Sequence, residues 1–187
     1  VPYKTCTFDC VYCECGKTTD LTCERREFYP LDELLDAAAE RIASLREPPD
    51  HLTLSGAGEP TLYSRMGELI DGLGKRSEAP VAVITNGSLL GDPAVRAELM
   101  RADVVLPSLD AATDEVFQRI NRPHPDCRIA SVIDGLERFV GEYRGRVLLE
   151  ILVVEGLNDG ANHLDALAAI VRRLPVEAVQ INTAVRP

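Results

Sequence analysis

The chain has 187 residues, of which 45% are hydrophobic and 27% are charged, and its formal net charge is −10. These values predict one soluble globular domain, since no apolar run is long enough to cross a membrane and no signal peptide precedes the first cysteine. The acidic balance argues against a nucleic-acid-binding surface, which needs a basic stripe. Because the chain begins at Val1 and ends directly after an apolar run, we expect residues 1–187 to be an excerpt of a longer protein.

Four cysteines stand within the segment TCTFDCVYCECG near the start of the chain, and Cys6, Cys10 and Cys13 form a C-x3-C-x2-C triplet. A disulfide scaffold is typical of smaller chains, and a thioredoxin-like dithiol would leave Cys6 without a role. A structural zinc site stays open, because Cys15 and Cys23 can complete its ligands. Three thiolates on one compact loop also suit a [4Fe–4S] cluster that takes its fourth ligand from elsewhere.

The rest of the chain alternates amphipathic helices with apolar strands. Residues 31–46 place their leucines on one helical face, with Pro30 at the entrance. The same spacing predicts helices near residues 63–76, 93–101, 127–143 and 161–173. Continuous apolar runs predict five strands, in the segments HLTLSG, VAVIT, VVLPSL, VLLEILVV and EAVQI. This order predicts a parallel sheet covered by helices, in either a barrel or a doubly wound arrangement.

Polar and glycine-rich residues cluster where these strands end, at Gly56 to Glu59, Thr85 to Gly87, Ser108 to Asp110, and Asn182. Parallel α/β sheets bind their ligands at this edge. Structural explanations compete for some of these positions. Asn86-Gly87 is a common turn, and Asp110 is a suitable cap for a helix that begins at Ala111.

The cysteine triplet, with Tyr12 directly before its last cysteine, resembles the signature of the radical S-adenosylmethionine (radical SAM) superfamily. The resemblance implies that Cys6, Cys10 and Cys13 bind three irons of a [4Fe–4S] cluster. The amine and carboxylate of S-adenosylmethionine (SAM) then chelate the fourth iron, and Tyr12 lies beside the adenine.

Three later segments resemble further motifs of this superfamily, in the same order along the chain. SGAGEPTLY resembles its glycine–glycine–glutamate motif, with Ala57 in place of the first glycine and Glu59 expected to receive the ammonium group of SAM. Alanine is tolerated at this position if its φ is negative. ITNGSLL and LPSLDAA follow, and the superfamily binds the ribose and carboxylate of the cofactor at the second of them. The resemblance thus implies cofactor contacts from Tyr12, Gly56, Ala57, Gly58, Glu59, Asn86, Ser108, Asp110 and Asn182.

The whole chain looks closest to a poorly characterised iron–sulfur oxidoreductase branch related to the wyosine-forming enzymes of tRNA. The expected fold is therefore a partial (β/α)6 TIM-type barrel of parallel strands, whose first strand is missing from this chain. We expect residues 1–187 to form a single radical SAM core domain. The implied activity is that of an oxidoreductase or transferase that cleaves SAM reductively and uses a 5′-deoxyadenosyl radical to abstract a substrate hydrogen.

The resemblance also implies a cytoplasmic protein with an electron donor such as flavodoxin or ferredoxin, and no membrane partner. Its substrate stays open among a small molecule, a protein and tRNA; Gln180, Asn182 and Arg186 are candidates to bind a polar or anionic group of it. Two alternatives remain: a glycyl-radical-enzyme activase, and a non-catalytic protein in which the triplet and Cys15 hold zinc or an electron-transfer cluster. Cys127 is expected to be packed in the interior.

Overall fold

The computed structural model of the chain describes residues 1–184. Its centre is a five-stranded parallel sheet in the order β3-β4-β5-β6-β7. The strands are β3 (Leu52–Leu54), β4 (Val81–Thr85), β5 (Val104–Pro107), β6 (Arg146–Val153) and β7 (Ala178–Thr183). All five strands predicted from the apolar runs are present, and neighbours in the sheet are neighbours in the chain.

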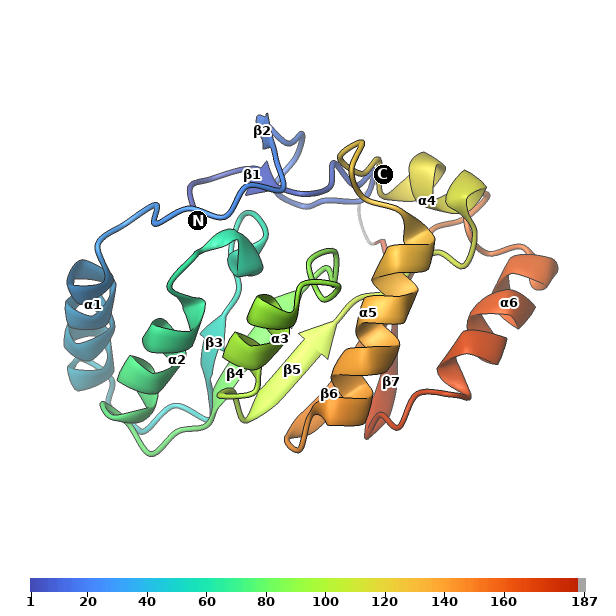
Figure 1. The fold of residues 1–187 in the computed structure, drawn as a ribbon. Coiled ribbons are helices and arrows are strands. Elements are labelled where there is room, and N and C mark those ends of the chain that lie inside the picture. The colour runs from blue at the N-terminus through green and yellow to red at the C-terminus, as the bar shows by residue number, and fades with distance from the viewer. Residues whose placement is uncertain (185–187) are drawn as a thin grey trace.

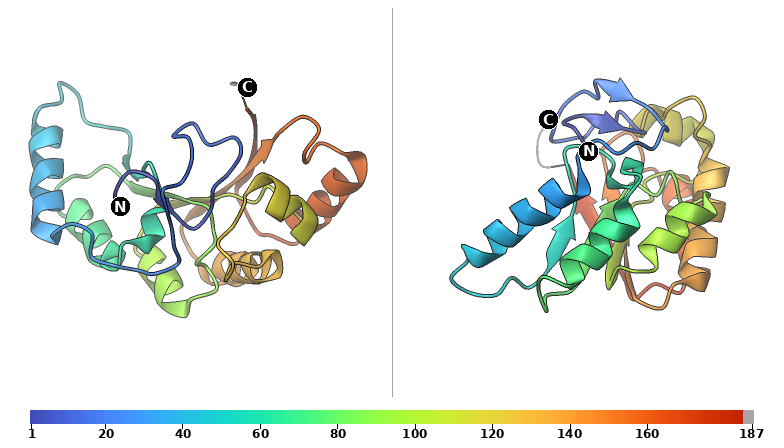
Figure 2. Two further views of the ribbon diagram at one scale, coloured as in Figure 1. Left: turned by 90° about the horizontal axis from the view of Figure 1, so that it is seen from above. Right: turned by 60° about the vertical axis from the view of Figure 1, so that its left-hand side comes forward.

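Helices cover one side of this sheet. They are α1 (Leu31–Ala43), α2 (Met66–Gly74), α3 (Pro93–Leu99), α4 (Asp114–Ile120), α5 (Ile129–Glu142) and α6 (Ala161–Val171). Figure 2 shows the sheet as a curved arc with the helices around its outer side. Within residues 1–184 the arc stays open, with β3 and β7 as its edges. This architecture confirms the expected partial (β/α) barrel.

Helix α4 is the one helix that the sequence did not reveal. It has seven residues and begins at Asp114. The side chain of Thr113 caps it by accepting a hydrogen bond from the backbone nitrogen of Val116. The alternative in which Asp110 caps a helix beginning at Ala111 is therefore wrong.

The core lies between the sheet and its helices. Val83, Val105 and Leu149 of the central strands are fully buried, as are Leu136 and Phe139 of α5. Val81, Ala82 and Val83 of β4 are buried at consecutive positions, so both faces of this strand are covered, which explains its continuous apolar run. Each buried valine, leucine or phenylalanine side chain contributes about 1.5–3 kcal/mol to folding. Within residues 1–184, no helix combines the length and the apolar character needed to cross a membrane.

The N-terminal segment lies across the carboxyl ends of the strands, at the upper edge of the molecule in Figure 1. Its two short strands, β1 (Thr5–Cys6) and β2 (Asp20–Leu21), pair in parallel with each other. The cysteine triplet begins in β1 and continues in the loop after it. The fold thus brings the triplet to the same edge as the polar strand ends.

Gly135 of α5 packs directly against the backbone that leads into α3. A Cβ at this position would lie 2.5 Å from the backbone nitrogen of Gly91 and 2.6 Å from the carbonyl carbon of Leu90. Because backbone cannot move aside as a side-chain tip can, we expect Gly135→Ala to reduce the free energy of unfolding by about 2 kcal/mol. Gly141→Ala is the matched control, since its Cβ meets nothing within 4 Å and alanine favours the helix. Urea unfolding curves measure both, and equal stabilities of the two variants would contradict this packing.

Candidate functional site

The glycine-rich loop after β3 seats the start of the cysteine segment through backbone contacts. The backbone nitrogen of Lys4 donates to the carbonyl of Ala57 at 2.6 Å, and that of Glu59 donates to the carbonyl of Thr5 at 3.0 Å. A Cβ on Gly58 would lie 2.1 Å from the Thr5 oxygen, so only glycine fits there. Ala57 is not among the residues with positive φ, which is why alanine is tolerated at its position, as expected.

The Glu59 carboxylate ties the ends of β3 and β4 together. Its Oε1 accepts hydrogen bonds from the backbone and the hydroxyl of Thr61, at 3.0 and 2.5 Å, and from the Thr85 hydroxyl at 2.7 Å. Its Oε2 accepts one from the backbone nitrogen of Asn86 at 2.8 Å. The side chain is 2% exposed, and this burial raises its pKa, against the opposing effect of the donors. Glu59 thus has a structural role that its motif did not reveal, while its contact with an ammonium group stays a prediction.

Each of the three triplet thiols accepts a hydrogen bond from a nitrogen in a different part of the chain. The pairs are Lys4 Nζ to Cys13 Sγ at 3.2 Å, Asn86 Nδ2 to Cys6 Sγ at 3.6 Å, and Asn121 Nδ2 to Cys10 Sγ at 3.5 Å. In the part of the chain that the structure describes, no donor reaches the thiol of Cys15. Since N–H donors favour anionic sulfur and tune the potential of iron–sulfur clusters, the surroundings distinguish the triplet from Cys15.

Lys4 is the least expected of these donors. Its residue is 3% exposed, and its backbone has a φ of 60°, in the left-handed region that residues other than glycine rarely adopt. No carboxylate of residues 1–184 forms a salt bridge with its ammonium group, and its side-chain acceptor is Cys13 Sγ. Burying an ammonium ion is unfavourable unless an anion compensates it. The Lys4 side chain therefore fits a site in which Cys13 is a metal-bound thiolate.

The thiols of Cys6 and Cys10 are protonated at neutral pH when no metal binds them. Burial raises the pKa of Cys6 to about 11 and that of Cys10 to about 12, although the Asn121 amide lowers the latter. Within residues 1–184, no three cysteine, histidine or acidic side chains converge on one point as ligands of a single ion would. Three thiolates that each bind a separate iron of one cluster need no such convergence.

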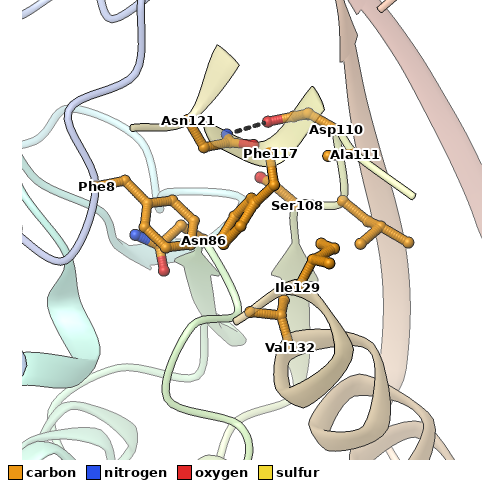
Figure 3. A pocket seen from close by; sticks show the side chains of 10 residues that line it. Phe8, Asn86, Ser108, Asp110, Ala111, Phe117, Asn121, Ile129 and Val132 are labelled. Atoms are coloured by element: carbon orange, nitrogen blue, oxygen red, sulfur yellow. Dashed lines mark hydrogen bonds between the residues drawn. The ribbon is translucent and has the colours of Figure 1, made fainter. Parts of the chain in front are cut away.

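A second network fastens the cysteine loop to the sheet through Asp110. The Tyr12 hydroxyl and Asn121 Nδ2 both donate to its Oδ2, the latter at 3.0 Å, and the backbone nitrogen of Leu152 donates to its Oδ1 at 2.8 Å. Asp110 is 4% exposed, and burial raises its pKa. In Figure 3, Asn121 and Asp110 face each other at the edge of a cavity of ≈ 10 Å³, large enough for one water molecule at most. Asp110 thus links three elements, and its contact with ribose stays a prediction.

We expect Asp110→Ala to destabilise the fold itself. The change leaves the donors on Tyr12, Asn121 and Leu152 without their acceptor, which costs about 3 kcal/mol and lowers the melting temperature by about 10 °C. Asp134→Ala on α5 is the control, because its carboxylate is exposed and its pair with Arg138 contributes little. Thermal unfolding followed by circular dichroism compares the variants. An unchanged melting temperature together with weakened SAM binding would restore the role expected from the sequence.

A cavity of ≈ 600 Å³ opens beside the cysteine loop, and its lining includes Tyr12, Cys13, Glu150 and Asn182. Asn182 Nδ2 donates to Glu150 Oε1 at 2.6 Å, and the Ser108 hydroxyl donates to Glu150 Oε2 at 3.2 Å. This volume is typical of cofactor and substrate pockets. Sequence reasoning missed Glu150, because it lies within the apolar run of β6 and belongs to no motif.

The other predicted residues lie farther from these contacts or outside the described chain. A Cβ on Gly56 would meet only the backbone nitrogen of Gly58, at 3.9 Å, so packing does not require glycine there. Gln180 lies on β7, whose residues are all exposed, and is not part of the cavity lining. Arg186 lies outside the described residues.

Comparison with known proteins decides the family. The model of the radical SAM superfamily matches residues 1–167. The chain belongs to the radical SAM superfamily. This confirms the resemblance carried by the triplet and the strand-end motifs. Membership in the radical SAM superfamily implies an enzyme that uses SAM and an iron–sulfur cluster.

Sequence relatives extend over the whole chain. A UPF0026 protein of Methanocaldococcus jannaschii is 32% identical over 188 residues, which cover 100% of this chain and 58% of that protein. A UPF0026 protein of Synechocystis sp. is 34% identical over 186 residues, covering 98% of this chain and 68% of its own length. "GTPase Obg" of Brachyspira hyodysenteriae is 33% identical over 186 residues, which are 27% of its length. The radical SAM chain thus spans less than two thirds of the first of these relatives.

Solved structures share the fold. TYW1 with a lysine-pyruvate adduct bound gives a TM-score of 0.69 at 20% identity, over 97% of this chain and 62% of that one. The anSMEcpe protein with bound AdoMet gives 0.71 at 18% identity, over 99% and 50%. Streptococcus suis SuiB bound to S-adenosylmethionine gives 0.70 at 14% identity, over 99% and 40%. At these identities the likeness establishes the radical SAM type of partial barrel.

Proposed function

We propose that this chain is the core of a radical SAM enzyme in which Cys6, Cys10 and Cys13 hold a [4Fe–4S] cluster and the adjoining cavity binds SAM. When bound, these cofactors supply reductive cleavage of SAM to methionine and a 5′-deoxyadenosyl radical, which removes a hydrogen atom from the substrate. The main support for the proposed cluster site is the hydrogen bonding of the triplet thiols. Three thiols on one loop each accept an N–H donor, and one of these donors is the buried Lys4.

The residues around the triplet bind and orient. Lys4 places a positive charge against Cys13, which balances the negative charge of a thiolate-ligated cluster. The contact of Tyr12 with Asp110 fixes the last part of the cysteine loop over the sheet edge. Glu150 and Asn182, on the cavity wall, present acceptors and donors that suit the hydroxyl, amine and carboxylate groups of a ligand.

The molecules bound to proteins of the same fold and the net charge of this chain both bear on the class of substrate. TYW1 is named with a lysine-pyruvate adduct bound, and SuiB is named with S-adenosylmethionine bound. These two structures support the proposal that this fold accepts SAM and a further organic ligand. The net charge of −10 favours a small molecule or a protein over tRNA as substrate. We further propose an electron donor such as flavodoxin or ferredoxin, a cytoplasmic location, and a single radical SAM core domain within a longer chain.

Anaerobic reconstitution with iron and sulfide tests the proposal. We expect about four irons and four sulfides per chain, as one [4Fe–4S] cluster requires. After reduction by dithionite with SAM present, chromatography should detect 5′-deoxyadenosine and methionine even without substrate. Cys13→Ala, treated in the same way, should give neither product. One bound zinc, or a reducible cluster that binds SAM but yields no 5′-deoxyadenosine with any reductant, would overturn the proposal.

A further inference from the structure

Two cysteines outside the triplet face each other in a partly buried contact. The Sγ atoms of Cys23 and Cys127 lie 3.5 Å apart, although 104 positions separate them in the sequence. Cys127 is 6% exposed, whereas Cys23 is partly exposed. Tertiary structure, not a shared loop, therefore brings these two thiols into contact.

Each of these thiols belongs to a segment that supports the start of the cysteine triplet. Beside Cys23, the backbone nitrogen of Thr22 donates to the carbonyl of Cys6 at 3.0 Å. Shortly before Cys127, the backbone nitrogen of His124 donates to the carbonyl of Thr7 at 2.8 Å. Figure 1 shows β1, β2 and the segment that enters α5 along the same edge of the molecule. These two supports, residues 22–23 and 124–127, bind the neighbouring residues Cys6 and Thr7. The thiols of Cys23 and Cys127 form a contact between the two supports.

We propose that Cys23 and Cys127 form a second redox site, a dithiol that a small-molecule disulfide such as glutathione disulfide oxidises reversibly to an intramolecular disulfide. Neither cysteine belongs to the triplet, so the proposal does not depend on the proposed function. A disulfide between them would join the two supports covalently and hold the triplet segment between them.

The disulfide forms by two successive thiol–disulfide exchange reactions. The more accessible Cys23 attacks one sulfur of glutathione disulfide as its thiolate, which forms a mixed disulfide and releases one glutathione thiolate. Cys127 then attacks the Cys23 sulfur and releases the second glutathione thiolate. The two glutathione thiolates take up the two protons lost by the protein thiols. The protein loses two electrons, glutathione disulfide gains them, and excess dithiol reductant reverses both steps.

The geometry suits this bond. The two sulfurs must close from 3.5 Å to the covalent distance of about 2.05 Å. Of the two thiols, the partly exposed Cys23 is more accessible to a disulfide in solution than the buried Cys127.

Peptide mapping of the reconstituted protein tests the proposal, because trypsin separates the cysteines cleanly. Cleavage yields the peptides 5–17, with the triplet and Cys15, 18–25, with Cys23, and 120–128, with Cys127. After treatment with glutathione disulfide, free thiols are blocked by N-ethylmaleimide in denaturant and the digest is analysed by mass spectrometry without reduction. We expect peptides 18–25 and 120–128 to appear as one disulfide-linked species that carries most of the Cys23. Dithiothreitol before blocking should abolish this species.

Two variants test whether the disulfide joins Cys23 to Cys127. Cys23→Ser should remove the linked species completely and leave Cys127 as a blocked thiol, whereas Cys15→Ser should leave the linked species unchanged. The proposal is overturned if Cys23 becomes linked mainly to peptide 5–17. It is also overturned if Cys23 and Cys127 are both recovered with N-ethylmaleimide attached, which shows that they remained free thiols, while glutathione disulfide oxidises the cysteines of peptide 5–17.

Discussion

Replacing any one of Cys6, Cys10 and Cys13 by alanine is expected to abolish assembly of the cluster, whereas Cys15→Ala is expected to retain it. In the proposed cluster each triplet thiolate is one of three protein ligands, so its loss would leave two irons without protein coordination. The hydrogen bonds around the cysteines also favour the triplet over Cys15 as cluster ligands. Each triplet thiol accepts a hydrogen bond from an N–H group, and within residues 1–184 the thiol of Cys15 accepts none. Iron and sulfide analysis after anaerobic reconstitution should fall from about four irons per chain to a small fraction of one.

Circular dichroism of the metal-free proteins is the control, since each alanine variant should retain the helical signal of the parent chain. Cys127→Ala should likewise keep its iron, because the Cys127 thiol contacts the Cys23 thiol and is not one of the expected ligands. Loss of the cluster in Cys15→Ala, with Cys6→Ala still binding four irons, would contradict the ligand assignment.

The second large effect is expected at Lys4. Replacing the ammonium group by the uncharged side chain of methionine removes a buried positive charge whose nitrogen lies 3.2 Å from Cys13 Sγ. For two unit charges about 5 Å apart at an effective dielectric constant of about 20, Coulomb's law gives about 3 kcal/mol, or roughly 0.1 V for one electron. Because reduction adds negative charge, Lys4→Met should shift the midpoint potential of the cluster to a more negative value by this amount.

An anaerobic redox titration followed by electron paramagnetic resonance measures this potential independently of turnover. Lys4→Arg is the matched variant: it retains the charge and should recover most of the shift, although its longer side chain changes the packing. The role assigned to Lys4 fails if Lys4→Met assembles a full cluster with the potential of the parent chain. A purely structural role would instead lower the melting temperature of both variants alike.

The sequence by itself determined the five strands of the central sheet, five of the six α-helices and the triplet. These features are local: an apolar run, a helical period or a C-x3-C-x2-C spacing is complete within a few residues. Helix α4 was missed although α3, which also has seven residues, was predicted; in α3 the helix starts at Pro93 directly after its cap Asp92, which is a local start signal. The same locality explains why Glu150 escaped notice, since one carboxylate within an apolar strand forms no pattern.

Only the tertiary structure decided what the polar residues of the strand ends contact. Glu59 meets Thr85 and Asn86 from the next strand, Asp110 meets Tyr12 from the cysteine loop, and the sulfur of Cys10 meets Asn121, 111 positions away. The sequence placed these residues at one edge of the sheet but left open whether they face a ligand or one another. A side chain's partners depend on which distant segments the fold brings within hydrogen-bond distance, and no local spacing records that.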